Sequence, residues 1–191
     1  LNLQECAKIT DSGLDSLADL QNITYLNLSG VKKITDDFAQ RATHMKRLNK
    51  LALLKCPKLT DKALEELSKI SSITALLLSS NEITKAGLEH LARLTNITNL
   101  TLYSDKLCDE DLLALTPLKK LQSLSFGSPL LTNDVFRCLG RLPSLTNIIL
   151  DAENVTDGSF NDLLSYCADV EKLVLYSKRA TMDTIRYEKN W

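Results

Sequence analysis

Residues 76–100, LLLSSNEITKAGLEHLARLTNITNL, contain one full copy of a pattern that recurs along the chain. The copy opens with alternating apolar residues, passes a turn, reaches an Ile-Thr pair and continues with regularly spaced leucines. These positions are Leu76-x-Leu78, Ile83-Thr84, Leu88, Leu91 and Leu94. Alternation is typical of a short strand, and a leucine spacing of about three places side chains on one face of a helix. The stretch therefore predicts a strand, a turn and a helix.

The residue that opens each copy recurs at intervals of 24 or 25 residues. It is, in order, Leu1, Leu26, Leu51, Leu76, Leu100, Leu124, Ile148 and Leu173. A near-fixed period of this size is the signature of a solenoid, in which each unit packs on its neighbours. Since no proline- or glycine-rich linker interrupts the series, we predict a single domain over residues 1–191 with about eight repeats.

The two ends of the repeat series carry separate expectations. The sequence begins inside a repeat, and an exposed parallel edge favours association, so we expect upstream repeats or a partner chain to cover the N-terminal edge. Residues 179–191 begin an eighth helix that lacks the leucines of the others. Because a solenoid needs its last core covered, we predict that Ile185, Tyr187 and Trp191 form a C-terminal cap.

A Thr-Asp pair precedes the helical leucines in several repeats. The full matches are Thr10-Asp11, Thr35-Asp36, Thr60-Asp61 and Thr156-Asp157, whereas Thr84-Lys85, Cys108-Asp109 and Thr132-Asn133 differ in one residue each. A threonine hydroxyl at a helix start accepts a hydrogen bond from a free backbone N–H, and the aspartate favours the positive end of the helix. The pair therefore predicts where each helix begins.

Together these features resemble the leucine-rich repeat family over essentially the whole chain. Cys6-x-x-Ile9-Thr10-Asp11 and Cys56-x-x-Leu59-Thr60-Asp61 resemble the cysteine-containing subtype found in F-box/LRR ubiquitin-ligase receptors. Residues 83–91 look like the GALA-type (ribonuclease-inhibitor-like) repeats of bacterial proteins and effectors. The resemblance implies an α/β horseshoe, with a parallel β-sheet on the concave face and helices on the convex face.

The resemblance also implies a ladder of Asn or Cys side chains that bond the backbone of neighbouring turns. The corresponding positions are Cys6, Val31, Cys56, Asn81, Asp105, Pro129, Glu153 and Lys178. Only three of these eight carry Asn or Cys, so we expect more irregular turns in the later repeats.

Strand residues beside the paired leucines are expected to face solvent on the concave side. We predict a partner-binding surface there, formed by Tyr25, Asn27, Leu54, Leu77, Ser79, Asn99, Thr101, Tyr103, Ile149, Asp151 and Tyr176. Apolar patches rimmed by polar groups often mark partner sites, where tyrosine is common. The alternative is that these residues are scattered strand formers without a partner.

A second candidate surface consists of three lysines that share one repeat position, Lys8, Lys33 and Lys58. They form either a basic rim for an acidic partner or solvated turns.

Composition and motifs argue against several functional classes. The net charge of −1 gives no general attraction to nucleic acid or anionic lipid, and no apolar run approaches the roughly 18 residues that span a bilayer. No serine-hydrolase, phosphate-loop or zinc-protease motif occurs. His44 and His90 fall on helix positions expected to face solvent, without metal-ligand spacing. We therefore expect no enzyme activity, metal or cofactor, and a protein as partner instead of nucleic acid or membrane.

The five cysteines are odd in number and lack C-x-x-C spacing. Cys6 and Cys56 lie two repeats apart, which places them roughly 10 Å apart on stacked strands, beyond the limit of about 7 Å for a disulfide. Cys138 and Cys167 are interpreted as helix packing residues. Free thiols favour an intracellular location, cytoplasmic or nuclear. Five N-x-S/T sequons, at Asn22, Asn27, Asn96, Asn99 and Asn154, argue the other way.

The sequence thus favours a non-catalytic module that binds a partner protein on its concave face. Two alternatives stay open. The cysteine-containing repeats resemble those of a substrate-recognition subunit of a ubiquitin ligase, and bacterial effectors use similar repeats. A structural subunit of a large assembly would instead dock through its ends, around residues 1–3 and 187–191.

Overall fold

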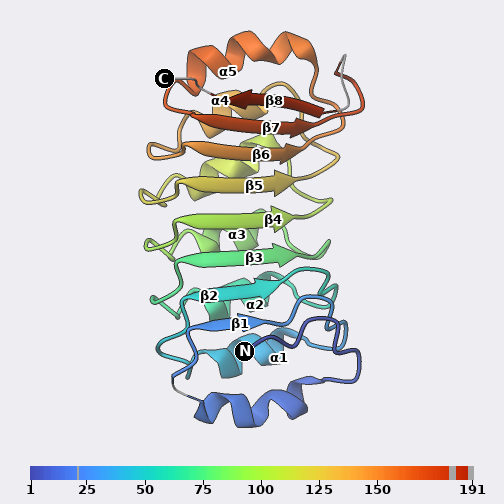
Figure 1. Cartoon of the computed structure of the whole chain (residues 1–191), viewed down its shortest axis with the longest axis vertical. Coiled ribbons are helices and arrows are strands. Elements are labelled where there is room, and N and C mark those ends of the chain that lie inside the picture. Colours follow the sequence, from blue (N-terminus) through green and yellow to red (C-terminus); the bar gives the residue numbers. More distant parts are fainter. Residues whose placement is uncertain (21, 181–183, 189–191) are drawn as a thin grey trace.

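Eight strands form one continuous sheet in the computed structural model, which describes residues 1–20, 22–180 and 184–188. The strands are β1 (Tyr25–Asn27), β2 (Lys50–Leu53), β3 (Ala75–Ser79), β4 (Asn99–Tyr103), β5 (Ser123–Gly127), β6 (Asn147–Asp151), β7 (Lys172–Tyr176) and β8 (Thr184–Glu188). Their order in the sheet follows the chain, and β1 to β7 run parallel (Figure 1). Equivalent repeat positions pair, so Leu76 lies beside Leu51 and Leu100.

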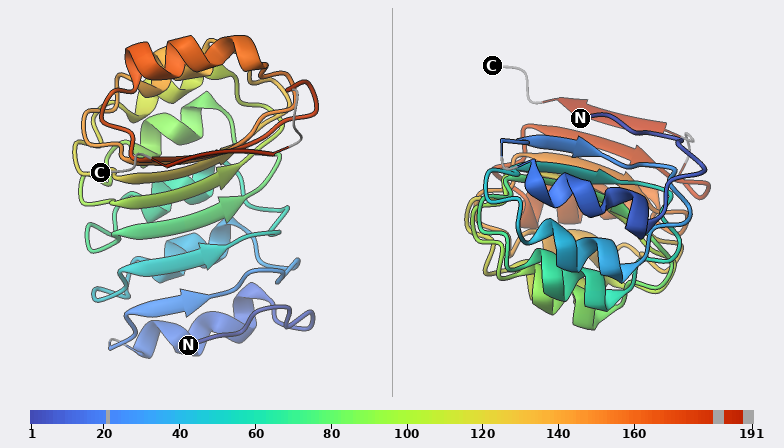
Figure 2. Two further views of the ribbon diagram at one scale, coloured as in Figure 1. Left: turned by 45° about the horizontal axis from the view of Figure 1, so that its top comes forward. Right: turned by 90° about the horizontal axis from the view of Figure 1, so that it is seen from below.

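The helical segments all lie on one face of this sheet (Figures 1 and 2). The α-helices are α1 (Asp36–Ala42), α2 (Asp61–Leu67), α3 (Lys85–Leu91), α4 (Val135–Leu139) and α5 (Phe160–Tyr166). The 3-10 helices are η1 (Asp11–Asp19), η2 (Asp109–Leu115) and η3 (Asp157–Ser159). This arrangement is an α/β leucine-rich repeat solenoid, with the sheet on the concave face and the helices on the convex face, as the sequence predicted.

The core lies between the sheet and the helices. Leu76 and Leu78 are fully buried, whereas Leu77 between them is only half-buried, which is the alternation that the sequence predicted. The helical leucines of the same repeat, Leu88, Leu91 and Leu94, close the core from the other side. The first repeat differs at Leu20, which directly follows η1 and is 47% exposed.

The threonine caps are confirmed at three helices. The hydroxyls of Thr35, Thr60 and Thr84 accept hydrogen bonds from the backbone N–H two residues further along, at the starts of α1, α2 and α3. Thr10 makes no such bond at η1, where its hydroxyl lies 3.0 Å from that of Ser12. The predicted threonine therefore begins α1, α2 and α3, whereas α4 and α5 follow Asp134 and Ser159 and have no side-chain cap.

The expected ladder of Asn and Cys is wrong in the later repeats. Its role is taken by the preceding residue, which in four repeats is a buried serine whose Oγ donates to a backbone carbonyl of the previous repeat, and which before Glu153 is the buried Ala152. These bonds run from Ser80 to Leu59, Ser104 to Ile83, Ser128 to Leu107 and Ser177 to Val155, at 2.6–2.7 Å. Asn81 is instead exposed and donates to Asp105. The later turns are regular, because the turn residue that points into the core lies one position earlier there than in the first three repeats.

The two ends of the sheet differ from each other. At the C-terminus the chain turns back as β8, which pairs antiparallel with β7 where an eighth helix was expected. Tyr187 packs against the core, as predicted for a cap, whereas Trp191 and the side chain of Ile185 lie outside the described part of the chain. At the N-terminus, residues 1–5 run beside β1, and the Leu3 N–H donates to the Asn27 carbonyl at 2.8 Å.

Candidate functional site

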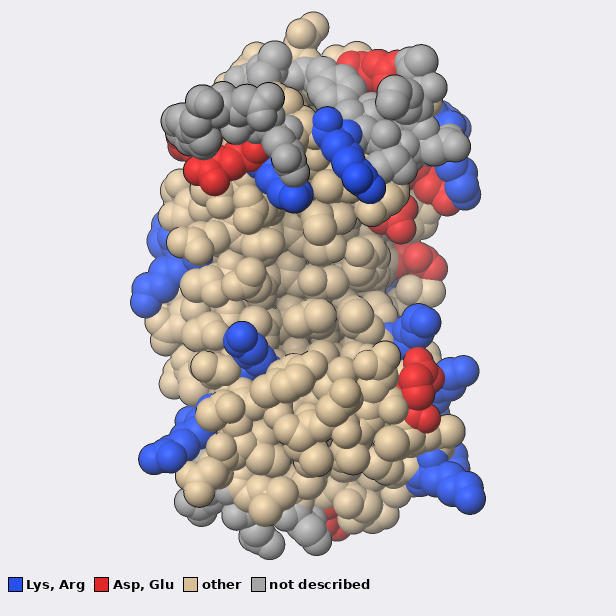
Figure 3. All heavy atoms as spheres, viewed as in Figure 1, with Lys and Arg blue, Asp and Glu red and all other residues tan. Residues whose placement is uncertain are grey.

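The strand face opposite the helices is open and carries little charge. Figure 3 views this face, and most lysine, arginine, aspartate and glutamate side chains gather along its margins. The residues on β3, β4 and β5 that face outward are Ala75, Leu77, Ser79, Asn99, Thr101, Tyr103, Ser123, Ser125 and Gly127. None of them is charged, and no helix in the described ranges covers them. This surface offers a partner apolar and hydrogen-bonding groups on a fixed sheet.

The residues predicted for partner binding differ in exposure. Those exposed to solvent are Tyr25, Asn99, Ile149, Asp151 and Tyr176, and those half-buried are Leu54, Leu77, Ser79, Thr101 and Tyr103. Asn27 is buried, because its Nδ2 donates to Gln4 at 3.1 Å and its Oδ1 accepts from the Ser29 N–H at 3.0 Å. Asn27 therefore holds the N-terminal segment and is not free for a partner.

Tyr103 leans across the neighbouring strand. Its hydroxyl shares a hydrogen bond of 2.9 Å with the hydroxyl of Ser125 on β5. A Cβ atom at Gly127 would lie only 2.3 Å from the ring atom Cδ1 of Tyr103. The glycine thus allows the ring to lie against β5, and the hydrogen bond fixes it there. A side chain that is already fixed loses little rotamer entropy when a partner contacts it.

Three hollows follow the edge at which the strands end, and neighbouring hollows share lining residues. The first, of about 300 Å³, includes Lys55, Pro57, Ser79, Ser80, Asn81, Glu82 and Tyr103. The second, of about 240 Å³, includes Tyr103, Asp105, Gly127, Ser128, Pro129, Asp151 and Glu153. The third, of about 330 Å³, includes Asp151, Glu153, Tyr176, Ser177 and Lys178. Because they are linked through Tyr103 and through Asp151 and Glu153, we call them together the strand-end groove.

Sequence reasoning missed part of this groove. Asp105, Pro129 and Glu153 were assigned to the turn ladder, but they line the middle hollow. The available signal was the serine before each of the first two, at Ser104 and Ser128, which is the residue that turns inward. Once the serine takes the inward position, the residue after it must project from the turn.

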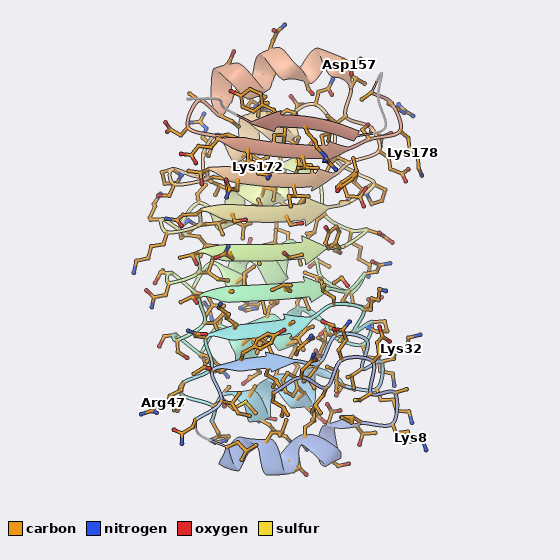
Figure 4. The ribbon with its side chains drawn as sticks, viewed as in Figure 1. Lys8, Lys32, Arg47, Asp157, Lys172 and Lys178 are labelled. Carbon is orange, nitrogen blue, oxygen red and sulfur yellow. The ribbon has the colours of Figure 1, made fainter. Side chains whose placement is uncertain are left out.

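The predicted basic rim is exposed at all three lysines, Lys8, Lys33 and Lys58. Figure 4 shows Lys8, Lys32 and Lys178 along the edge at which the strands end, with Arg47 at the opposite edge. The basic positions of the early repeats and the strand-end groove of the later repeats therefore occupy the same edge of the solenoid. Whether a partner uses the lysines stays a prediction.

The thiols are poorly suited to nucleophilic chemistry. Burial raises the pKa of Cys56 to about 11 and that of Cys167 to about 12. Burial also raises the pKa of Cys138, and burial together with the neighbouring Asp111 raises the pKa of the half-exposed Cys108. These four thiols therefore stay protonated at neutral pH, and a protonated thiol is a weak nucleophile and a weak metal ligand. The buried Cys138 and Cys167 fit the packing role predicted for them.

The histidines and acidic residues form no metal centre in the described ranges. No group of three or more His, Cys, Asp and Glu side chains there is placed to hold a metal ion. His44 is exposed as expected, but His90 is half-buried, and its Nδ1 is shielded from water without a hydrogen-bond partner among the described residues. Of the helices that the structure describes, none combines the length and apolar character required to cross a membrane.

Comparisons with known proteins support the fold. No protein-family model matches the chain, and no curated protein matches it. Among solved structures, it is similar to internalin C2 of Listeria monocytogenes, with a TM-score of 0.63 and 22% sequence identity over 92% of this chain and 79% of that chain. An internalin F of the same organism aligns with a TM-score of 0.48 and 19% identity, over 87% of this chain and 63% of that one. The first likeness shows a leucine-rich repeat fold.

Proposed function

We propose that this protein is a non-catalytic module that binds a partner protein on its strand face. The observation that carries the proposal is the open strand face, uncharged across β3 to β5 and bordered by the strand-end groove. Rigid stacked strands present this surface in advance, so little conformational entropy is lost on docking. Tyr103, Ile149 and Tyr176 supply aromatic and aliphatic anchors of the kind that dominate protein interfaces.

The proposal extends to the repeat subtype and the location. The period of 24 or 25 residues supports the cysteine-containing, GALA-like subtype, and so does Cys56, whose thiol donates to the Leu28 carbonyl at 3.4 Å. A single domain, a reducing intracellular location and a partner that is neither nucleic acid nor membrane belong to the same proposal. A ubiquitin-ligase role rests only on the resemblance of the Cys-containing repeats. An F-box in the full-length gene would support that role.

Site-specific photo-crosslinking tests the strand-face proposal. A benzophenone amino acid is placed at Leu77 on the strand face and, as a matched control, at Leu113, an exposed leucine on η2 of the convex side. The proteins are irradiated in extract of the cells that express this chain, and crosslinked products are identified by mass spectrometry. We expect a specific product from position 77 only, and its loss when Ile149→Asp is introduced.

The same experiment separates the proposal from docking through the ends. A third crosslinker at Leu20, which is exposed beside the end of η1, reports contacts of the first repeat. Products from position 20 without products from position 77 would contradict strand-face binding and support a structural subunit. Equal products from positions 77 and 113 would also contradict it, because they would show contacts without preference for a face.

A further inference from the structure

We propose that the middle hollow of the strand-end groove binds an arginine side chain of the partner protein. The inference rests on the proposed function and adds the chemistry of one contact. Three carboxylates, those of Asp105, Asp151 and Glu153, line this hollow, and no basic side chain in the described ranges does. Glu153 pairs with Lys178, whereas Asp105 and Asp151 form no ion pair among the described residues. A partner that buries the hollow without supplying positive charge would leave these two carboxylates desolvated and without a cation partner, which is costly.

The three carboxylates keep unused hydrogen-bond capacity. Asp105 accepts from the Asn81 side-chain amide at 2.5 Å, and Glu153 pairs with Lys178 in the neighbouring hollow. The hydrogen bond to Glu153, together with the charges of Glu153 and Asp151, raises the pKa of Lys178. The Asp151 carboxylate accepts no side-chain or backbone hydrogen bond among the described residues. A guanidinium carries five N–H donors in a planar fork and can bond more than one carboxylate at once.

The wall of the hollow suits a planar cation. Tyr103, Gly127 and Asp151 occupy the same row of β4, β5 and β6, so the Cα atoms of Tyr103 and Asp151 lie about 10 Å apart, at two strand spacings. The Tyr103 ring leans into this interval over Gly127 and is held by Ser125. Guanidinium groups stack on aromatic faces. They are also more weakly hydrated than ammonium groups, so their transfer from water into an interface costs less free energy. The hollow therefore offers a ring for stacking and a carboxylate beyond it.

The charges that line the strand-end groove also favour a cation in its middle hollow over the first and third hollows. The third hollow contains Lys178 beside Asp151 and Glu153, and the first contains Lys55. The middle hollow is thus the part of the groove with the most negative lining, and charge complementarity assigns the basic group of the partner to it.

A peptide titration tests the arginine site. The probe is the acetylated and amidated pentapeptide Gly-Ser-Arg-Ser-Gly, added to the whole ¹⁵N-labelled protein and followed by NMR. We expect shifts of the backbone amides of Tyr103, Gly127 and Asp151. The same peptide with citrulline, an uncharged isostere of arginine, is expected to cause no such shifts. Asp151→Asn is expected to weaken binding about three- to fivefold, because one charge pair is lost.

Glu89→Gln provides the matched control, since it removes one exposed carboxylate on α3 and should leave the titration unchanged. Asp151 is exposed and its carboxylate accepts no hydrogen bond among the described residues, so we expect the variant to keep the fold, which an unchanged spectrum away from the hollow would verify. Equal binding of the citrulline peptide, shifts centred elsewhere, or no effect of Asp151→Asn would overturn the arginine site. If position 77 crosslinks a partner while the peptide fails, only this inference is lost and strand-face binding stands.

Discussion

The carboxylate of Asp61 holds Thr84 of the next repeat through two hydrogen bonds, at 2.8 Å from the backbone N–H and at 2.6 Å from the hydroxyl. The same pair of bonds joins Asp11 to Thr35, Asp36 to Thr60 and Asp109 to Thr132. We call each such pair a rung. The Thr-Asp motif therefore acts twice, since its threonine caps a helix while its aspartate fastens the following repeat.

Removing one rung is expected to destabilise the solenoid. In Asp61→Ala the N–H and hydroxyl of Thr84 lose their acceptor at a half-buried site, and we expect the free energy of unfolding to fall by about 1–3 kcal/mol. Urea denaturation followed by circular dichroism measures this change. Glu65→Ala, at an exposed position of the same helix, is the control and should change stability by less than about 0.5 kcal/mol. Equal effects of the two substitutions would contradict the importance of the rung.

Within the series from Asp11 to Thr156, the rung between positions 85 and 108 is missing, and its restoration should stabilise the protein. The position equivalent to Asp61 carries Lys85, and the position equivalent to Thr84 carries Cys108. The Cys108 N–H instead donates to the Asp111 carboxylate in its own repeat at 3.0 Å. Lys85→Asp combined with Cys108→Thr recreates both partners of the rung. We expect a favourable coupling of about 0.5–1.5 kcal/mol beyond the sum of the single substitutions, measured by a double-mutant cycle in urea. Strict additivity would show that the rung does not form.

The sequence predicted the repeating elements well because each repeat carries its own local signals. The alternation around Leu77 and the leucines after Thr84 determine a strand and a helix without reference to distant residues. The same reasoning failed at β8, since residues 179–191 lack the leucine pattern that distinguishes a helix in the other repeats. The strand there is determined by pairing with β7, which is a tertiary contact.

The candidate site was less predictable for a similar reason. Alternation correctly placed Leu77, Thr101 and Ile149 on the open face. It did not reveal that Asn27 would be buried and hydrogen-bonded to Gln4, nor that the Tyr103 ring would lie over Gly127. Each of these contacts joins residues about one repeat apart, and the hollow between them arises from side chains of several turns. Patterns within one repeat contain no information on such contacts.

Three glycines should respond differently to alanine, according to what the new Cβ would meet. At Gly140 the nearest atom is the backbone oxygen of Tyr166, at 2.3 Å, whereas at Gly127 it belongs to the Tyr103 ring, a side chain that can move if its hydrogen bond to Ser125 is given up. Gly13 has no neighbour within 4 Å. We therefore expect Gly140→Ala to be the most destabilising, by about 1–3 kcal/mol, Gly127→Ala to cost less, and Gly13→Ala to cost nothing. Thermal unfolding measures the order, and a different order would contradict the contacts described.

Asp109 is expected to make stability depend on pH in a direction opposite to that of an ordinary paired carboxylate. Burial raises its pKa, although hydrogen bonds from Thr132 act against the increase. The folded state therefore binds this proton more tightly than the unfolded chain does. The contribution of Asp109 to the free energy of unfolding consequently grows as pH falls through the folded-state pKa and is lost as pH rises through it.

The variant Asp109→Asn isolates this effect. Asparagine can form the rung, because Asn133 already accepts from the Thr156 N–H at 2.8 Å and donates to its hydroxyl at 3.0 Å. We expect the variant to fold, and we expect the stability of the natural protein relative to it to be higher at about pH 4 than at about pH 7. Urea denaturation at both values measures the difference, with the exposed Asp169→Asn as control. A difference that is the same at both pH values, or smaller at the lower one, would show that the buried carboxylate does not take up a proton in the folded state.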